Sequence, residues 1–180
     1  MAPGVPLEEA RRAARALARG LRFPGAPPRR RPRVVPVGSV RRGTAARVKD
    51  LDLLVVAPAG AIRRGLLAGA ALPRGWRLRR ERAAGPRRRA LDVASPAGRR
   101  LRVDLFAATP AELPFALLHF TGPWRYNVRL RARAKARGWR LNQYGLFGAR
   151  SGRPAGGPRP RSERALAARL GVRFRAPAAR

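Results

Sequence analysis

The chain has 180 residues, of which 42 are Lys or Arg and nine are Asp or Glu, so its formal net charge at pH 7 is +33. A hydrophobic content of 45% excludes global disorder, and the absence of cysteine excludes disulfides and thiolate metal sites. The single histidine, His119, excludes a zinc site built on imidazoles, and no apolar run approaches the roughly 20 residues of a membrane span. A positive charge of this size indicates a polyanionic partner, most commonly nucleic acid.

The first half of the chain alternates short helices and strands. In chain order, the patterns predict a helix over 7–19, a Pro- and Arg-rich loop over 24–32, a strand over 33–37, a helical turn after Gly38-Ser39, a strand over 50–57 and a helix over 61–72. Three strands over 76–82, 88–93 and 101–106 are separated by Gly/Pro turns, which predicts a β-meander.

The character of the sequence changes near residue 108. "TPAE" (109–112) resembles a capping box and predicts a helix to about residue 120. A strongly basic helix over 123–137, a strand over 139–147, a loop over 151–160, a helix over 162–170 and a last short strand follow. We therefore expect an α+β protein with two domains, residues 1–108 with a mixed β-sheet and flanking helices, and residues 109–180 forming a small α+β domain.

Three of the few carboxylates stand at apolar strands. Asp50 and Asp52 are two residues apart, so both side chains point to one face of a strand. Asp104, in "RVDLFA", begins the apolar part of another strand. Hard divalent cations take such oxygen ligands, and two Mg²⁺ ions, with Mn²⁺ as an alternative, can activate a hydroxyl for in-line displacement. The alternative is that these aspartates only pair with the surplus arginine on a solvated surface.

The Gly38-Ser39 turn precedes the aspartates and suits a phosphate. A glycine lets backbone N–H groups approach phosphate oxygens closely, and Ser39 adds a hydroxyl group. Arg42 follows, and guanidinium groups bind phosphate in a bidentate manner. A turn of this kind is weak evidence when taken alone. Together with the aspartates it favours a metal-dependent nucleotidyltransferase.

The segments "VGSVRR…DLDLLVV" and "VDLF" resemble the palm signature of the family X DNA polymerases, the polymerase beta superfamily. The segment "HFTGPWRYNVRLRARAKARGWRLNQYGLF" (119–147) resembles the thumb signature of that family and is the more specific match. The likeness covers most of the chain from about residue 34. It is greatest to the small viral members of the African swine fever virus type, which have only a palm and a thumb-like domain.

The resemblance implies a nucleotidyltransferase palm over 1–108 and a thumb-like domain over 109–180. It implies that Asp50, Asp52 and Asp104 are catalytic metal ligands and that Asp104 accepts the proton of the primer 3′-hydroxyl. The implied nucleotide-binding residues are Gly38, Ser39, Arg42, His119, Phe120, Thr121, Gly122 and Asn127. The implied DNA-binding residues lie on the basic helix and are Arg129, Arg131 and Lys135.

The sequence thus predicts a DNA-directed DNA polymerase that fills short gaps during DNA repair, with DNA and dNTP as partners. We expect a monomer that is soluble and intracellular, in the host cytoplasm or the virion if the source is viral, and that does not bind membranes. Two alternatives remain open at this stage. One is a template-independent transferase, or one that modifies RNA or a small molecule, and the other is a basic DNA-binding protein without catalysis.

Overall fold

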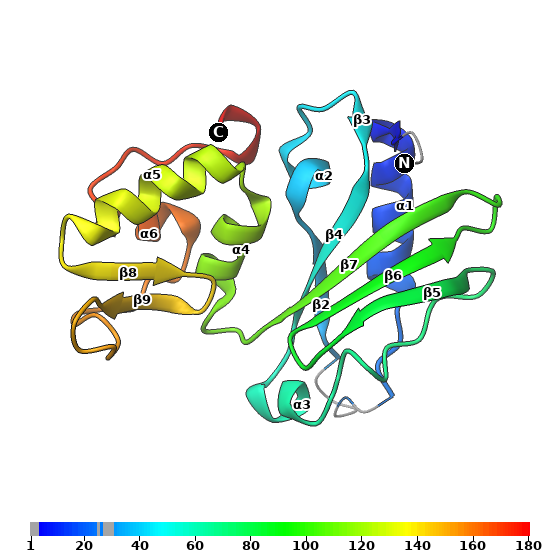
Figure 1. The fold of residues 1–180 in the computed structure, drawn as a ribbon, viewed down its shortest axis with the longest axis horizontal. Coiled ribbons are helices and arrows are strands. Elements are labelled where there is room, and N and C mark those ends of the chain that lie inside the picture. Colours follow the sequence, from blue (N-terminus) through cyan, green and yellow to red (C-terminus); the bar gives the residue numbers. More distant parts are fainter. Residues whose placement is uncertain (1–3, 25, 27–30) are drawn as a thin grey trace. The chain divides into compact units, whose positions relative to one another are not determined.

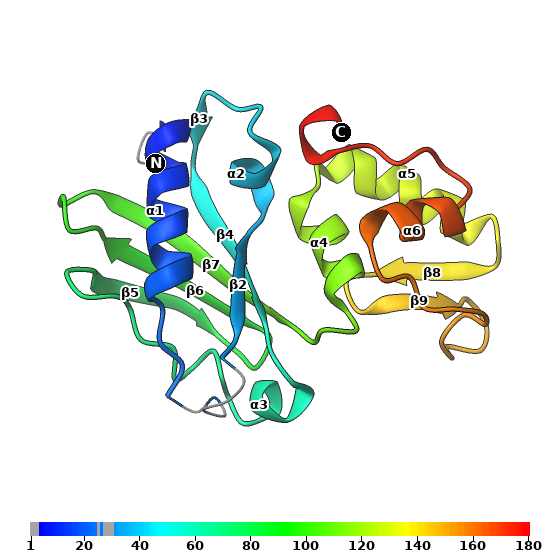
Figure 2. The same cartoon turned by 180° about the vertical axis from the view of Figure 1, so that it is seen from behind.

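The computed structural model describes residues 4–24, 26 and 31–180. The chain forms two compact units, Met1–Pro110 and Ala111–Arg180. Figure 1 shows the elements of both units coloured along the chain, and Figure 2 shows the same ribbon from behind. The expected α+β class with a mixed sheet is confirmed.

A five-stranded mixed sheet forms the centre of the first unit, with the strand order β2-β4-β7-β6-β5. Its strands are β2 (Arg33–Pro36), β4 (Asp50–Val56), β5 (Arg77–Ala84), β6 (Arg88–Ala94) and β7 (Arg100–Ala108). Strands β4 and β7 run parallel, and every other neighbouring pair is antiparallel. The predicted β-meander is therefore β5-β6-β7, and the chain crosses from β4 to the far edge of the sheet before it returns.

Helix α1 (Leu7–Gly20) lies against one face of this sheet, as both views show. Its buried residues Ala10, Ala14 and Leu17 recur at helical spacing, and the two small side chains allow the helix to approach the strands closely. The strands present Leu51, Leu53, Val55 and other apolar side chains to the same buried cluster. Because side chains alternate along a strand, the residues between these positions face the opposite side.

Short elements complete the first unit. Strand β1 (Val5–Pro6) pairs with β3 (Arg47–Val48) and thereby ties the start of α1 to the segment that leads into β4. Helix α2 (Gly38–Arg42) occupies the turn between β2 and β4. Helix α3 (Ala59–Arg63) follows β4.

The second unit packs three helices and a hairpin around its own apolar cluster. Its elements are α4 (Leu113–Thr121), α5 (Trp124–Lys135), β8 (Trp139–Asn142), β9 (Gly145–Gly148), α6 (Glu163–Arg169) and the 3₁₀ turn η1 (Pro177–Ala179). Phe115, Tyr126, Leu130 and Leu166 are buried in this cluster. Ser162 caps α6, because its hydroxyl oxygen accepts a hydrogen bond from the N–H of Ala165 at 3.0 Å.

Several sequence-based predictions of local structure are wrong. The helix expected over 61–72 is limited to Ala59–Arg63, because Gly65 adopts φ +81° and ends the helical path. Helix α4 begins only at Leu113, after "TPAE", and Pro114 fills its first turn, where no N–H is needed. The loop expected over 24–32 lies partly outside the described residues.

The strand expected over 139–147 is a hairpin instead. The side-chain oxygen of Asn142 accepts hydrogen bonds from the N–H groups of Tyr144 and Gly145, at 2.9 and 3.1 Å, and this Asx-type turn reverses the chain. No strand follows α6 in the described residues, where the chain continues irregularly to η1. Nor does any helix in the described ranges combine the length and apolarity that a bilayer span requires.

Candidate active site

The parallel pairing of β4 with β7 brings the predicted carboxylates together. Asp52 is the register partner of Asp104, and Asp50 is the partner of Arg102. Since cross-strand partners share a face, the three aspartates lie on the face of the sheet opposite the α1 cluster. We call this surface the open face. The Asp104 side chain is only 5% exposed, because it lies on a central strand with neighbours on both sides.

Burial and the neighbouring carboxylates make the Asp52 carboxyl group a weaker acid. Burial raises the pKa of Asp52 to about 6, and the negative charges of Asp104 and Asp50 add to the rise. Arg42 and Arg102 act in the opposite direction but do not compensate. The fold therefore holds a carboxyl group where ionisation is costly, which indicates a site shaped for a cation or for chemistry.

The glycine of the predicted phosphate turn lies directly against this carboxylate. Gly38 has φ +59°, and a Cβ built on it would stand 2.0 Å from Oδ2 of Asp52. A backbone hydrogen bond from Val37 N–H to Asp52 O, 2.8 Å long, fixes the two segments to each other. Ser39 and Arg42 lie on the same short helix α2. The structure thus places the Gly38-Ser39 turn in direct contact with Asp52.

Arginine occupies the carboxylate oxygens of Asp104. Arg88, from β6, donates to Oδ1 from Nε at 3.2 Å and from Nη2 at 2.8 Å. Arg102, from β7 itself, donates from Nε to Oδ2 at 3.2 Å and lies 3.9 Å from Asp50 Oδ1. The alternative in which these aspartates pair with arginine is therefore realised at Asp104 and in part at Asp50.

The donor set has the right chemistry for a hard divalent cation, since it consists of carboxylates whose mutual repulsion a cation would relieve. The side chains do not converge, however: among the described residues no group of three or more His, Cys, Asp or Glu is arranged to hold a metal ion. Oδ1 of Asp104 already accepts two charged hydrogen bonds from Arg88, and Oδ2 accepts one from Arg102.

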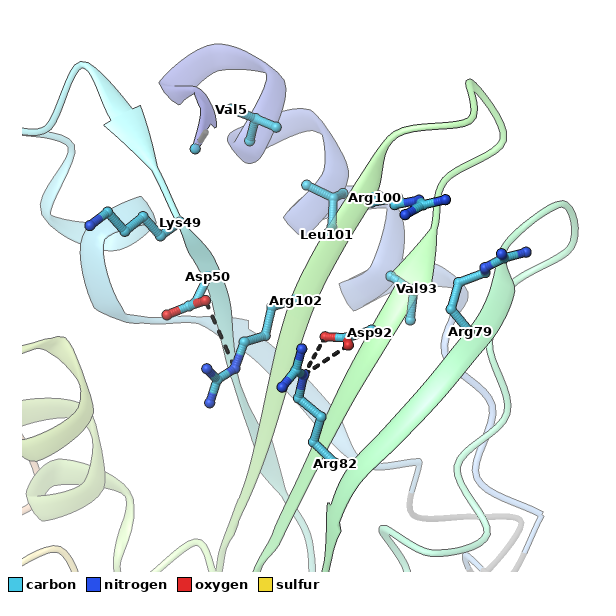
Figure 3. Close-up of a pocket in the computed structure, with 11 residues that line it drawn as sticks. Val5, Lys49, Asp50, Arg79, Arg82, Asp92, Val93, Arg100, Leu101 and Arg102 are labelled. Atoms are coloured by element: carbon cyan, nitrogen blue, oxygen red, sulfur yellow. Dashed lines mark hydrogen bonds and ion pairs between the residues drawn. The ribbon is translucent and has the colours of Figure 1, made fainter. Parts of the chain in front are cut away.

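A cavity of about 670 Å³ is lined by Asp50 but by neither Asp52 nor Asp104. Figure 3 shows Arg102 beside Asp50, and Arg82 reaching the carboxylate of Asp92 on the neighbouring strand. The Arg82 Nε lies 2.7 and 2.8 Å from the two oxygens of Asp92, and this hydrogen bond lowers the pKa of the Asp92 carboxyl. Further cations line the cavity, namely Lys49, Arg79 and Arg100. Nothing in a chain so rich in arginine distinguishes Arg82 or Arg88 in the sequence, and Asp92 has no motif around it.

The second unit brings together three of its predicted site residues. Asn127 Nδ2 donates to the backbone oxygen of His119 at 2.7 Å, and Arg131 Nη2 lies 3.0 Å from His119 Nδ1. Asn127 and Arg131 are one turn apart on α5, and His119 lies in the last turn of α4. The side-chain oxygen of Asn127 is buried without a partner, so one hydrogen-bond acceptor remains unused.

The protonation state of His119 follows from its partner. Burial lowers the pKa of His119, and the charge of Arg131 lowers it further. A guanidinium group offers only donors, so Nδ1 accepts and the neutral ring carries its proton on Nε2. His119 thus presents an N–H donor on the side away from Arg131.

The remaining predicted residues lie around this pair of helices. Phe120 packs edge-on against His119, with ring centroids 4.8 Å apart. Thr121 is fully buried at the end of α4, and Gly122 adopts φ 62° where the chain turns into α5. Arg129 and Lys135 are exposed on α5. Each unit therefore holds its own cluster of predicted residues.

Comparison with known proteins identifies relatives of this chain. The family model described as DNA polymerase beta thumb matches residues 116–180. A Repair DNA polymerase X of African swine fever virus (isolate Pig/Kenya/KEN-50/1950) is 33% identical over 144 residues, which cover 80% of this chain and 79% of the relative. Another, from the strain Badajoz 1971 Vero-adapted, is 35% identical over 114 residues, and the match spans only 63% of either chain.

Solved structures share the fold. The polymerase beta of Leishmania infantum, in a ternary P/T complex, aligns with a TM-score of 0.74 and 20% identity over 97% of this chain and 76% of that chain. The same enzyme in a ternary gap complex aligns with the same TM-score and identity over 70% of its own length. The fold is therefore the one seen in polymerase beta.

The viral relatives identify the family to which the chain belongs. On the match to the Kenyan relative, the chain belongs to the family X DNA polymerases, and the resemblance found in the sequence is confirmed. Members of this family use divalent metal ions.

Proposed function

We propose that this protein is a DNA-directed DNA polymerase that adds deoxynucleotides to a primer 3′-hydroxyl and fills short gaps during DNA repair. The observation that carries the proposal is the pairing of Asp52 with Asp104 on parallel strands, directly against Gly38. Two viral relatives are named Repair DNA polymerase X, and the solved polymerase beta structures are complexes with primer–template or gapped DNA.

The open face supplies the groups for phosphoryl transfer. Asp50, Asp52 and Asp104 would hold two Mg²⁺ ions. When bound, such ions would lower the pKa of the attacking hydroxyl and stabilise the leaving oxygen of the triphosphate. Asp104 is the group on the neighbouring strand, and it would accept the proton of the primer 3′-hydroxyl.

The triphosphate would be held by α2. Gly38 has no side chain, which allows the turn to lie directly against Asp52, where a larger residue would clash with the carboxylate. Ser39 would add a hydroxyl donor, and Arg42 would neutralise charge beside Asp52, on whose carboxylate it already acts. We propose these three residues as the phosphate-binding side of the site.

The sugar and base of the nucleotide would be bound by the second unit. The neutral His119 offers an N–H donor, and the segment 120–122 would line the deoxyribose. The Nδ2 group of Asn127 has a second N–H beside the one donated to the His119 backbone, and it would donate to the acceptors on the minor-groove edge of the incoming base. Arg131 would reach the nascent pair or the template, and the exposed Arg129 and Lys135 would bind DNA phosphates.

Net charge supports DNA as the partner. With a formal charge of +33, the chain would release many counterions from a DNA backbone, so binding would weaken steeply as salt is raised. We propose that a single copy of the chain binds the DNA inside the cell. The identity of the metal and the number of ions are part of the same proposal.

Primer extension tests this function. The wild-type protein should extend a primer at a one-nucleotide gap with the complementary dNTP, only with Mg²⁺ or Mn²⁺ present, and more slowly with the matching rNTP. Equal incorporation of all four dNTPs on single-stranded DNA would indicate a template-independent transferase instead. Tight DNA binding with no incorporation under any of these conditions would indicate a DNA-binding protein without catalysis.

A further inference from the structure

Asp104 is held from two sides by arginine, and the two arginines differ. Arg102 comes from the same strand, two residues away, and its guanidinium also lies near Asp50. Arg88 comes from β6, where Ala90 is the register partner of Asp104 and leaves space for a long side chain to reach across. Both guanidinium contacts on Oδ1 come from Arg88.

The exposure of the Arg88 side chain allows its guanidinium group to leave Asp104. Its side chain is 51% exposed, whereas that of Asp104 is 5% exposed. Its guanidinium lies 5.9 Å from the centre of the Phe106 ring, a contact that restrains the group without fixing it. An exposed arginine has a long, flexible stem, so the ion pair can open without a change in the backbone.

We propose that Arg88 is a positioning residue that occupies Asp104 in the metal-free protein and must release it before the carboxylate can ligate a metal ion. Arg88 keeps Oδ1 paired while no other cation is present, and it competes with the metal for this oxygen. The proposal rests on the proposed function, because it takes Asp104 as a metal ligand.

DNA would favour the release. Arg88 and Arg102 meet at Asp104, and a DNA phosphate offers the half-exposed guanidinium of Arg88 a strong alternative acceptor. A phosphate that binds Arg88 frees Asp104, so DNA and metal should each strengthen the binding of the other. By linkage the two enhancements are equal, and couplings of this kind are typically about 5–150-fold.

The test measures metal binding without turnover. Mn²⁺ is titrated into wild-type protein and the Arg88→Met variant, and free Mn²⁺ is followed by electron paramagnetic resonance, with and without gapped DNA whose primer ends in a dideoxynucleotide. Methionine keeps an apolar stem against Phe106 but cannot pair with Asp104. The matched control is Arg99→Met, which removes the same charge and an ion pair of 3.1 Å with a different carboxylate, Glu9.

The expected result is that Arg88→Met binds Mn²⁺ about 5-fold or more tightly than wild type without DNA, and that DNA then adds little further affinity. Unchanged or weaker Mn²⁺ binding by the variant would overturn the proposal. Tighter binding in Arg99→Met to the same extent would also overturn it, since net charge alone would then explain the effect. An unchanged DNA enhancement in Arg88→Met would overturn the coupling.

Two further measurements separate a loss of folding and a loss of activity from the effect on metal binding. Thermal unfolding of each variant confirms that it is folded, and Arg88→Gln replaces Arg88→Met if the latter unfolds. Primer extension by the wild type is recorded separately. A wild-type protein that binds Mn²⁺ as expected but extends no primer would refute the proposed function and leave the role of Arg88 standing.

Discussion

The two faces of the five-stranded sheet are built from alternating residues of the same strands and differ most around Asp52 and Asp104. On the face against α1, Leu53 and Leu105 are fully buried among apolar neighbours. On the open face, Asp52 and Asp104 take the intervening positions and are surrounded by Arg42, Arg88 and Arg102. The apolar face stabilises the fold, whereas the open face crowds like charges at a cost in stability.

The comparison shows how a single sheet separates stability from function. Because side chains alternate, a substitution at one residue of β4 should affect mainly the free energy of unfolding, and a substitution at its neighbour mainly the reaction. Strained electrostatics of this kind are typical of catalytic sites, since groups placed for a transition state are rarely placed for the stability of the resting protein.

The largest effect is expected on the open face. Asp52→Asn and Asp104→Ala should each lower nucleotide incorporation by about 10³-fold or more, because each removes a charge on which the transferring phosphate depends. The affinity for gapped DNA should stay close to that of wild type, since arginine side chains bind the DNA phosphates. Single-turnover kinetics and DNA titrations measure the two quantities, and normal turnover by either variant would refute the role of that carboxylate.

The neighbouring residue on the apolar face should give the converse result. Leu53→Ala leaves a cavity at a fully buried position and should reduce the free energy of unfolding by about 2–5 kcal/mol. Incorporation at a temperature well below the unfolding transition should change little. Urea denaturation measures the free energy of unfolding of the variant, and the same kinetic assay measures its incorporation rate. A variant of normal stability that has lost activity would erase the distinction between the faces.

The contact between Gly38 and Asp52 gives an intermediate effect. Gly38→Ala places a methyl group on the Asp52 carboxylate and requires a residue other than glycine at φ +59°. We expect incorporation to fall by about 10²-fold, the effect of moving a reacting group by about 1 Å. Gly69→Ala is the matched control, because a Cβ at Gly69 would meet no atom within 4 Å and the φ of this residue is not in the left-handed region. Equal activity of the two variants would show that α2 does not position the carboxylate.

The smallest effect concerns the pH dependence of stability. The pKa of Asp52 is about 6 in the folded protein and near 3.8 when unfolded, so the folded state binds the proton more tightly. Its contribution to stability is therefore most favourable below about pH 4 and is lost as the pH rises through 6. At pH 7.5, Asp52→Asn should be more stable than wild type by about 1–2 kcal/mol, allowing for partial solvent exposure.

Urea denaturation of wild type and Asp52→Asn at intervals from pH 4 to pH 7.5 measures this difference. The gap between the two free energies should open between pH 4 and pH 6.5 and then remain constant. A constant gap over the whole range would mean that Asp52 titrates alike in the folded and unfolded chain.

The sequence predicted which carboxylates lie on one face of the sheet, but it did not single out the arginines that pair with them. The spacing of Asp50 and Asp52, followed by an apolar run, is enough to place both on one face, and the motif around Asp104 places a third carboxylate on a strand. The partner of Asp104 depends on the register of β6 against β7. In a chain with 42 Lys and Arg, no local pattern singles out Arg88.

The same limit applies to the elements that were predicted wrongly. The helix expected over 61–72 has suitable apolar spacing, but the positive φ of Gly65 is a property of the folded backbone. The turn at Asn142 is made by its own side chain, and it interrupts a segment whose residue types favour a strand throughout. Local propensity gives the type of an element more reliably than its end.

The most direct test of the central claim maps where a metal binds. Fe²⁺ is bound in place of Mg²⁺, and hydroxyl radicals generated with ascorbate and peroxide cut the backbone beside the ion. If the open face is the metal-dependent catalytic site, cleavage should fall next to Asp50, Asp52 and Asp104 and disappear in Asp104→Ala. Cleavage at other positions, or an unchanged pattern in Asp104→Ala, would contradict the assignment of the active site to this face.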